Sequence, residues 1–137
     1  MEREITGSCL CKSVEFVVKD DFKKFYFCHC EQCRKLTGSA HVSHLFTSPS
    51  NIRWSKGEEL TQRYDHPTRT FSNVFCKECG SRLPYLSKNG RALVVPAGCL
   101  NEEPSRTPDA QIFCSEETGW HKAGLNSIKL NGFPENT

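Results

Sequence analysis

The sequence lacks a long apolar segment, and this absence limits where the protein can work. Its longest uninterrupted aliphatic run covers residues 92–95, whereas a membrane-spanning helix needs about 20 apolar residues. The first residues, MEREITGSCLC, also lack the apolar stretch of a signal peptide. We therefore expect a cytoplasmic protein with no membrane partner.

A strong excess of either charge is missing as well. The 18 basic and 16 acidic residues give a net charge of +2, and no run of Lys and Arg is longer than two residues. Proteins that bind nucleic acid usually carry a concentrated basic patch, so we expect no nucleic-acid partner. The weak positive charge favours an anionic small molecule instead.

The chain is short and has few apolar residues. Its 137 residues fit one domain, since a typical domain has about 100–150 residues. A hydrophobic fraction of 36% and a charged fraction of 25% are typical of a folded protein. We expect a single domain over residues 1–137, whose small core would gain stability from a bound metal.

Short segments with alternating apolar residues predominate, which indicates a mostly β fold. Val14, Phe16 and Val18 recur with a period of two, as the residues on one face of a strand do. The Asn89-Gly90 pair lies between segments 83–87 and 92–95 and predicts a hairpin. We also expect a strand around residues 25–27, strands at 42–46, 70–75 and 110–114, one short helix at 31–36 that ends near Gly38, a polar loop at 101–108 and a frayed end at 134–137.

Nine cysteines are the most prominent feature that the sequence does contain. The cytosol keeps thiols reduced, and an odd number of cysteines fits a disulfide framework poorly. Seven of the nine fall in three tight clusters, whereas cysteines that only fill a core tend to occur singly. Metal binding is therefore the favoured interpretation of these seven residues.

The first and third clusters together offer four thiolate ligands. Cys9 and Cys11 are two positions apart, so in a strand both side chains would point to the same face. Cys76 and Cys79 suit a tight turn, which Gly80 can leave at positive φ. Four thiolates around one ion are a usual structural zinc site. We expect these two pairs to hold one structural zinc ion.

The middle cluster, Cys28, Cys30 and Cys33, offers three thiolates. Three ligands leave the fourth position of zinc to water or a substrate, which is the pattern of a catalytic site. A fourth side chain could instead close the site, and the candidates are Cys99, Cys114, His29, His41 and His44. A third interpretation is a redox dithiol formed by Cys30 and Cys33.

The charge of a three-thiolate zinc site restricts its chemistry. Three negative ligands on a divalent ion leave a net charge of about −1, which makes the ion a weak activator of water and disfavours hydrolysis. A soft, anionic thiolate would still suit the fourth position. Positive charge nearby would help such a ligand to bind, and Arg34 and Lys35 directly follow Cys33.

Five segments of the chain resemble the glutathione-dependent formaldehyde-activating enzyme family, which also includes centromere protein V. They are GSCLC at 7–11, CHCEQCRKLTGS at 28–39, FCKECGSRL at 75–83, VPAGCL at 95–100 and PDAQIF at 108–113. The resemblance implies a small, mostly β, Mss4-like (β-tent) zinc-binding fold. It also implies a structural zinc on Cys9, Cys11, Cys76 and Cys79 and a catalytic zinc on Cys28, Cys30 and Cys33.

The same resemblance implies a carbon–sulfur lyase or synthase. Family chemistry is the addition of the glutathione thiol to formaldehyde, so the implied partners are a small thiol such as glutathione and an aldehyde. Ser39, Thr37, His29 or water could protonate the alkoxide that the addition forms. The competing hypothesis is a non-catalytic zinc-binding carrier or protein-interaction module. A homodimer is compatible with both hypotheses.

Overall fold

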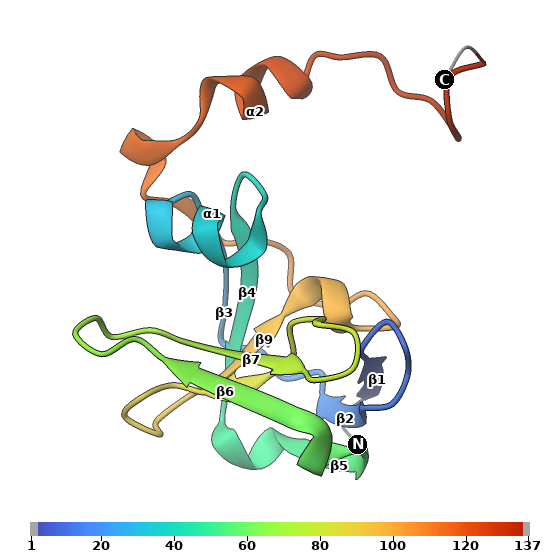
Figure 1. The fold of residues 1–137 in the computed structure, drawn as a ribbon, viewed down its shortest axis with the longest axis vertical. Coiled ribbons are helices and arrows are strands. Elements are labelled where there is room, and N and C mark those ends of the chain that lie inside the picture. The colour runs from blue at the N-terminus through green and yellow to red at the C-terminus, as the bar shows by residue number, and fades with distance from the viewer. Residues whose placement is uncertain (1–2, 136–137) are drawn as a thin grey trace.

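The computed structural model describes residues 3–135 and consists mainly of short strands (Figure 1). The strands are β1 (Glu4–Ser8), β2 (Glu15–Lys19), β3 (Lys24–Cys28), β4 (Val42–Thr47), β5 (Ile52–Lys56), β6 (Thr61–Asp65), β7 (Ser72–Cys76), β8 (Tyr85–Leu86), β9 (Leu93–Pro96) and β10 (Ala110–Ile112). The helices are α1 (Glu31–Thr37) and α2 (Gly119–Gly124), with 3₁₀ turns η1 (Pro49–Asn51), η2 (Glu58–Leu60), η3 (Ala97–Cys99) and η4 (Cys114–Glu116). None of the helices described is long and apolar enough to cross a membrane.

The strands form three sheets. One sheet has the order β1-β2-β5, the largest has the order β10-β3-β4-β9-β8, and β6 and β7 form a two-stranded ribbon. In the largest sheet β10 runs parallel to β3, whereas the other neighbouring strands are antiparallel. Figure 1 shows β3 and β4 as a long pair with α1 at one end and α2 beyond it.

The hydrophobic core lies between these sheets. Phe16 and Val18 of β2 are each 1% exposed and share one core cluster with Leu45 of β4. Strand side chains alternate between the two faces, so Phe16 and Val18 enter the core from the same face of β2. Phe16 also packs directly over Gly7, where an added Cβ atom would collide with its ring. This contact gives the glycine of the GSCLC segment a packing role.

The C-terminal strand is held beside β3 by a carboxylate. Asp109 accepts a hydrogen bond from the backbone N–H of Phe25 at 2.8 Å and two from the Arg106 side chain at 2.9 Å. The backbone N–H of His29 then donates to the carbonyl oxygen of Ile112 at 3.0 Å. These bonds bring the segment after β10 next to the junction of β3 and α1.

Most of the elements expected from the sequence are confirmed. The helix after Cys30 ends at Gly38, whose φ of 67° is left-handed. The hairpin expected at Asn89-Gly90 joins β8 to β9, with Gly90 at φ 71°. Residues 101–109 contain no strand or helix, as expected for the polar loop.

Three elements, β5, β6 and α2, were not expected from the sequence. Strand β6, TQRYD, is exposed over four of its five residues, so it carries no apolar alternation that would reveal it. Helix α2, GWHKAG, begins and ends with glycine, a weak helix former. The frayed end expected at 134–137 lies partly outside the described residues.

Candidate metal centres

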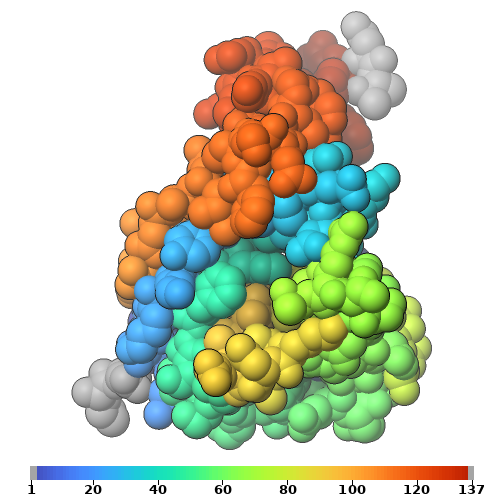
Figure 2. Space-filling view, turned by 90° about the vertical axis from the view of Figure 1, so that its left-hand side faces the viewer, coloured from blue at the N-terminus to red at the C-terminus, as the bar shows by residue number. Residues whose placement is uncertain are grey.

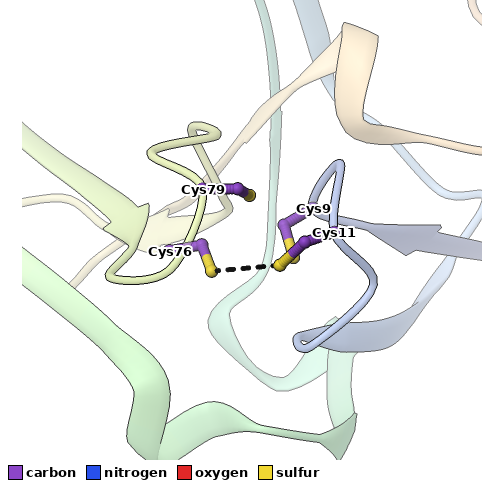
Figure 3. Close-up of side chains that lie close together, drawn as sticks. All are labelled: Cys9, Cys11, Cys76 and Cys79. Carbon is purple, nitrogen blue, oxygen red and sulfur yellow. Dashed lines mark hydrogen bonds between the residues drawn. The ribbon is translucent and has the colours of Figure 1, made fainter.

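The first group of candidate metal ligands joins two turns that are distant in the sequence. One sulfur atom from each of Cys9, Cys11, Cys76 and Cys79 lies within 4.8 Å of the other three, and Figure 3 shows the side chains converging from two loops. The sulfurs are 3.6 Å apart for Cys9 and Cys11 and 3.9 Å apart for Cys11 and Cys76. A tetrahedron with metal–sulfur bonds of about 2.3 Å has edges of about 3.8 Å. The spacing of these sulfurs therefore fits a four-thiolate metal site.

The expectation that Cys9 and Cys11 lie in a strand is wrong. Strand β1 ends at Ser8, which pairs with Glu15 of β2, so the chain must reverse its direction between them. The turn is closed by a hydrogen bond from the Lys12 N–H to the Cys9 carbonyl oxygen, with Lys12 at φ 63°. The turn, and not strand alternation, brings the two sulfurs together.

The second pair lies in the tight turn that the sequence predicts. Cys76 ends β7, and the N–H of Gly80, at φ 77°, donates to the Cys76 carbonyl oxygen at 2.8 Å. The pKa of Cys79 is lowered to about 5, mainly by a hydrogen bond with the Ser81 hydroxyl. In contrast, desolvation raises the pKa of Cys76 to about 11. Without a cation the four thiols would not all ionise near neutral pH.

The second group of candidate ligands lies where β3 runs into α1. Cys28 ends β3, Cys30 is the N-cap of α1 and Cys33 lies in its first turn. One sulfur from each lies within 4.8 Å of the others, and those of Cys30 and Cys33 are 3.1 Å apart. Among residues 3–135 no histidine, carboxylate or further cysteine joins this group at that distance. The group therefore offers three side-chain ligands.

Two thiols of this group, those of Cys28 and Cys33, resist ionisation on their own. Burial raises the pKa of Cys33, and the neighbouring Cys30 and Cys28 raise it further. Burial also raises the pKa of Cys28. Three thiolates so close together would repel one another strongly. A divalent cation would offset the negative charge of this donor set.

The residues considered as a fourth ligand lie elsewhere. The Cys99 thiol donates to the Pro96 carbonyl oxygen at 3.0 Å, and desolvation raises its pKa to about 12. Cys114 is exposed in η4. His44 is buried beside Arg82, and desolvation with the charge of Arg82 lowers its pKa to about 3. All nine cysteines are free thiols in the described structure, so Cys30 and Cys33 form no disulfide.

A pocket of about 360 Å³ adjoins the three-cysteine group. It is lined by Cys28, Cys30, Cys33, Glu31, Gln32, Arg69, Phe113 and Glu116. Arg69 brings positive charge, while Phe113 offers an apolar surface that is 58% exposed. The backbone N–H of Glu31 donates to the Glu116 carboxylate at 3.0 Å and joins α1 to η4 at the pocket.

The positive charge at this pocket differs from the sequence expectation. Arg34 and Lys35, which follow Cys33, are not among the residues that line it. Arg69 comes from the loop between β6 and β7, and no pattern in the sequence predicts that this loop lies near Cys33. Its position depends on the pairing of β6 with β7, and β6 has no apolar pattern.

A partly buried polar network lies around Arg82 and includes His44 and Asn73. Arg82 donates to the ring nitrogen Nε2 of His44 at 3.1 Å and to the Asn73 side-chain oxygen at 2.6 Å. Its Nη2 atom is buried and has no partner within residues 3–135. Burial raises the pKa of Tyr85, and the charges of Cys33 and Arg82 also act on it. Tyr85 thus lies within electrostatic range of both Cys33 and the half-buried Arg82.

The side chains considered as proton donors do not line the pocket. The Thr37 hydroxyl donates to the Cys33 carbonyl oxygen at 2.9 Å and accepts from the Ser39 N–H at 3.1 Å, so it caps the end of α1. Ser39 is exposed just after that helix. His29 is fully buried and bonds to Gln111 at 2.9 Å.

Three comparisons with known proteins bear on this site. The sequence model of a family described as glutathione-dependent formaldehyde-activating enzyme matches residues 4–116. An uncharacterised lyase of Schizosaccharomyces pombe is 29% identical over 116 residues, which cover 83% of this chain and 81% of the yeast protein. A crystal structure of a Rhodobacter sphaeroides protein, a structural genomics target, is similar with a TM-score of 0.59 at 22% identity, over 77% of this chain and 98% of that one.

These comparisons confirm the mostly β, Mss4-like fold expected from the sequence. The matched family region contains both cysteine groups but ends before α2.

Proposed function

The chain belongs to the glutathione-dependent formaldehyde-activating enzyme family, and we propose that it is a zinc-dependent carbon–sulfur lyase or synthase acting on adducts of a small thiol with an aldehyde. Its family and its relation to a yeast lyase support a lyase. The observation that carries the finer proposal is the three-cysteine group, which has no fourth side-chain ligand among residues 3–135 and adjoins a pocket. Formaldehyde and glutathione are the first substrates to test.

Both cysteine groups fit zinc, and we assign them different roles. Cys9, Cys11, Cys76 and Cys79 provide four sulfurs at tetrahedral spacing and would hold a structural ion. Cys28, Cys30 and Cys33 provide three sulfurs beside a pocket and would hold a catalytic ion. When bound there, zinc supplies a positive centre that favours the thiolate form of an incoming thiol.

The residues of the pocket suit an anionic thiol. The Arg69 guanidinium can pair with a substrate carboxylate through charge-assisted hydrogen bonds. The Gln32 amide can both donate to and accept from a peptide group. Phe113 offers its ring to the apolar part of the substrate. A thiol that carries carboxylates and peptide groups, as glutathione does, matches this combination.

The reaction needs one proton transfer besides the new bond. Addition breaks the S–H bond of the thiol, joins the sulfur to the carbonyl carbon and moves a proton to the carbonyl oxygen. The reverse reaction breaks the carbon–sulfur bond and returns the proton to the sulfur. Since Thr37, Ser39 and His29 do not line the pocket, we assign the proton transfer to water. Water can enter, because Phe113 and Glu116 at the pocket are exposed.

We expect the protein to work in the cytoplasm, where thiols stay reduced. Free thiols at all nine cysteines are consistent with that environment.

A second candidate function is a protein-interaction module. Five large apolar side chains of the C-terminal segment are exposed, namely Trp120, Leu125, Ile128, Leu130 and Phe133. Exposed apolar surface of this kind is typical of interaction sites. In this reading the zinc ions would stabilise the fold and the cysteine pocket would not turn over a substrate.

NMR exchange spectroscopy on an equilibrium mixture of glutathione, formaldehyde and their hemithioacetal tests the proposal. We expect the zinc-loaded protein to accelerate interconversion above the rate in buffer. A parallel mixture with 2-mercaptoethanol tests whether the thiol must carry a carboxylate. If fully zinc-loaded protein accelerated neither mixture, the lyase proposal would fail and the interaction module would be favoured.

A further inference from the structure

A third group of candidate metal ligands lies next to the three-cysteine group without sharing any residue with it. It consists of His29, Glu117 and His121, and one ligand atom from each lies within 4.8 Å of the other two. His29 stands between Cys28 and Cys30 in the chain, and successive side chains of an extended segment point to opposite sides. The imidazole of His29 therefore faces away from the sulfurs of its two neighbours.

His29 has the hydrogen bonding of a metal ligand. Its Nε2 atom lies 2.9 Å from the side-chain oxygen of Gln111, which can only accept a hydrogen bond, so Nε2 carries the proton. The lone pair is then on Nδ1, which is buried and has no partner in the part of the chain that the structure describes. Histidines that bind metals usually donate their other N–H in this way, which fixes the ring and its tautomer.

The other two ligands come from the segment that begins α2. The hydroxyl of Thr118 accepts a hydrogen bond from the His121 N–H at 3.3 Å and caps the helix. Glu117 directly precedes this cap, four positions before His121, and both side chains are half-buried. In Figure 2 the orange segment that contains α2 lies over the cyan segment of α1. The fold thus brings the C-terminal segment to the buried face of His29.

We propose that His29, Glu117 and His121 bind a divalent first-row transition ion such as Zn²⁺, separately from both cysteine groups. Two imidazoles and one carboxylate are a common ligand set for such ions and leave a further position for water. The ring of His41 lies 5.0 Å from that of His29 and 5.4 Å from that of His121, so a third imidazole borders the site.

The ion would act as a tether for α2. The segment that leads into α2 is mostly exposed, and Glu116 in this segment is hydrogen-bonded to α1. An ion bound by both His29 and His121 would hold α2 against the junction of β3 and α1. Because the family match ends at residue 116, two of the three ligands lie outside the matched region.

The experiment uses protein whose cysteine groups are already loaded with zinc, to which further Zn²⁺ is added. Long-range ¹H–¹⁵N spectra of the imidazoles follow each histidine. We expect Nδ1 of His29 and one ring nitrogen of His121 to shift together, with His29 keeping its proton on Nε2. If the signals of these two residues did not move, the proposal would be wrong, whether or not the protein is a lyase.

Variants provide an independent count of the ions. Equilibrium dialysis should show one more zinc per chain for the wild type than for Glu117→Gln or His121→Gln. The controls Glu102→Gln and His66→Gln, which remove a carboxylate and an imidazole outside the group, should keep the extra ion. Equal zinc contents in all five proteins would overturn the proposal. If a variant does not fold, the imidazole spectra of the wild type alone decide the question.

Gln111 allows a finer test, because it acts on His29 and would not bind the ion itself. Gln111→Leu should weaken zinc binding at this group by about 10- to 100-fold. The imidazole spectra should also show that His29 no longer holds a single tautomer. Unchanged affinity with an unchanged tautomer would contradict the assignment of Nδ1 as the ligand.

Discussion

The sulfur atoms of Cys11 and Cys76 lie 3.9 Å apart, although the two residues are separated by 65 positions in the sequence. Cys11 belongs to the turn between β1 and β2, and Cys76 ends β7. The two turns belong to different sheets. A metal ion at this point would therefore hold two sheets of a small protein together.

Loss of this ion should unfold the protein. The apparent free energy of zinc binding to a structural site is about 10–16 kcal/mol, while the stability of a whole domain is about 5–15 kcal/mol. We therefore expect Cys76→Ser, or removal of zinc from the wild type by a chelator, to abolish the cooperative thermal transition in circular dichroism. Cys114→Ser, which removes an exposed thiol outside the cysteine groups, should melt like the wild type.

Gly7 should not tolerate even one added methyl group. A Cβ atom there would collide with the ring of Phe16, which is 1% exposed and cannot move outward. We expect Gly7→Ala to lower the free energy of unfolding by about 1–3 kcal/mol, measured by urea denaturation. Gly98→Ala, where a Cβ would meet nothing within 4 Å, is the matched control. Equal midpoints for the two variants would argue against the packing described.

Arg69 should determine the affinity for anionic thiols. Removing one charge-assisted hydrogen bond in a partly exposed pocket costs about 1–1.5 kcal/mol, so Arg69→Gln should raise the half-saturating concentration of glutathione by about 10-fold. The value for 2-mercaptoethanol, which has no carboxylate, should change little. Arg91→Gln, an exposed arginine that does not line the pocket, is the control. An equal effect of Arg69→Gln on both thiols would rule out a carboxylate contact.

His44 should make the protein less stable in mild acid. The pKa of His44 is about 3 in the folded protein, against 6.5 for a free histidine, because the ring is desolvated beside Arg82. Between these values the unfolded chain binds a proton that the folded chain does not, so stability falls as the pH drops below 6.5 and is retained above it.

The comparison that isolates this effect is between the wild type and His44→Gln. Between pH 7.5 and pH 5.5 the thermal midpoint of His44→Gln should fall less steeply than that of the wild type. The control His66→Gln should show the same pH dependence as the wild type. Parallel pH profiles for the wild type and His44→Gln would mean that His44 is not held neutral by its surroundings.

The sequence predicted which cysteines lie together better than it predicted their surroundings. Cys28, Cys30 and Cys33 are close in the chain, so the backbone alone keeps their sulfurs near one another. The pairing of Cys9 and Cys11 with Cys76 and Cys79 was expected because a structural zinc ion takes four ligands and each pair offers two. The strand geometry assumed for Cys9 and Cys11 was wrong, because the reversal between β1 and β2 lies at these residues.

The residues around the site depend on tertiary structure that no local pattern reveals. Arg69 reaches the pocket through the β6–β7 ribbon, and Glu116 through the parallel pairing of β10 with β3. Glu117 and His121 come near His29 through the same pairing. Each of these contacts joins segments whose relative position is set by the sheet order. Spacing along the chain therefore gave no sign of them.

The three-cysteine group is where we expect the chemistry to take place. The most direct test is to measure by NMR the rate at which glutathione and formaldehyde exchange with their hemithioacetal. The rate is measured with the wild type, Cys30→Ser and Cys114→Ser, and the fold and zinc content of each protein are checked first. We predict acceleration by the wild type and by Cys114→Ser, and a rate equal to that in buffer for a folded Cys30→Ser. Full acceleration by Cys30→Ser, or none by the zinc-loaded wild type, would contradict this expectation.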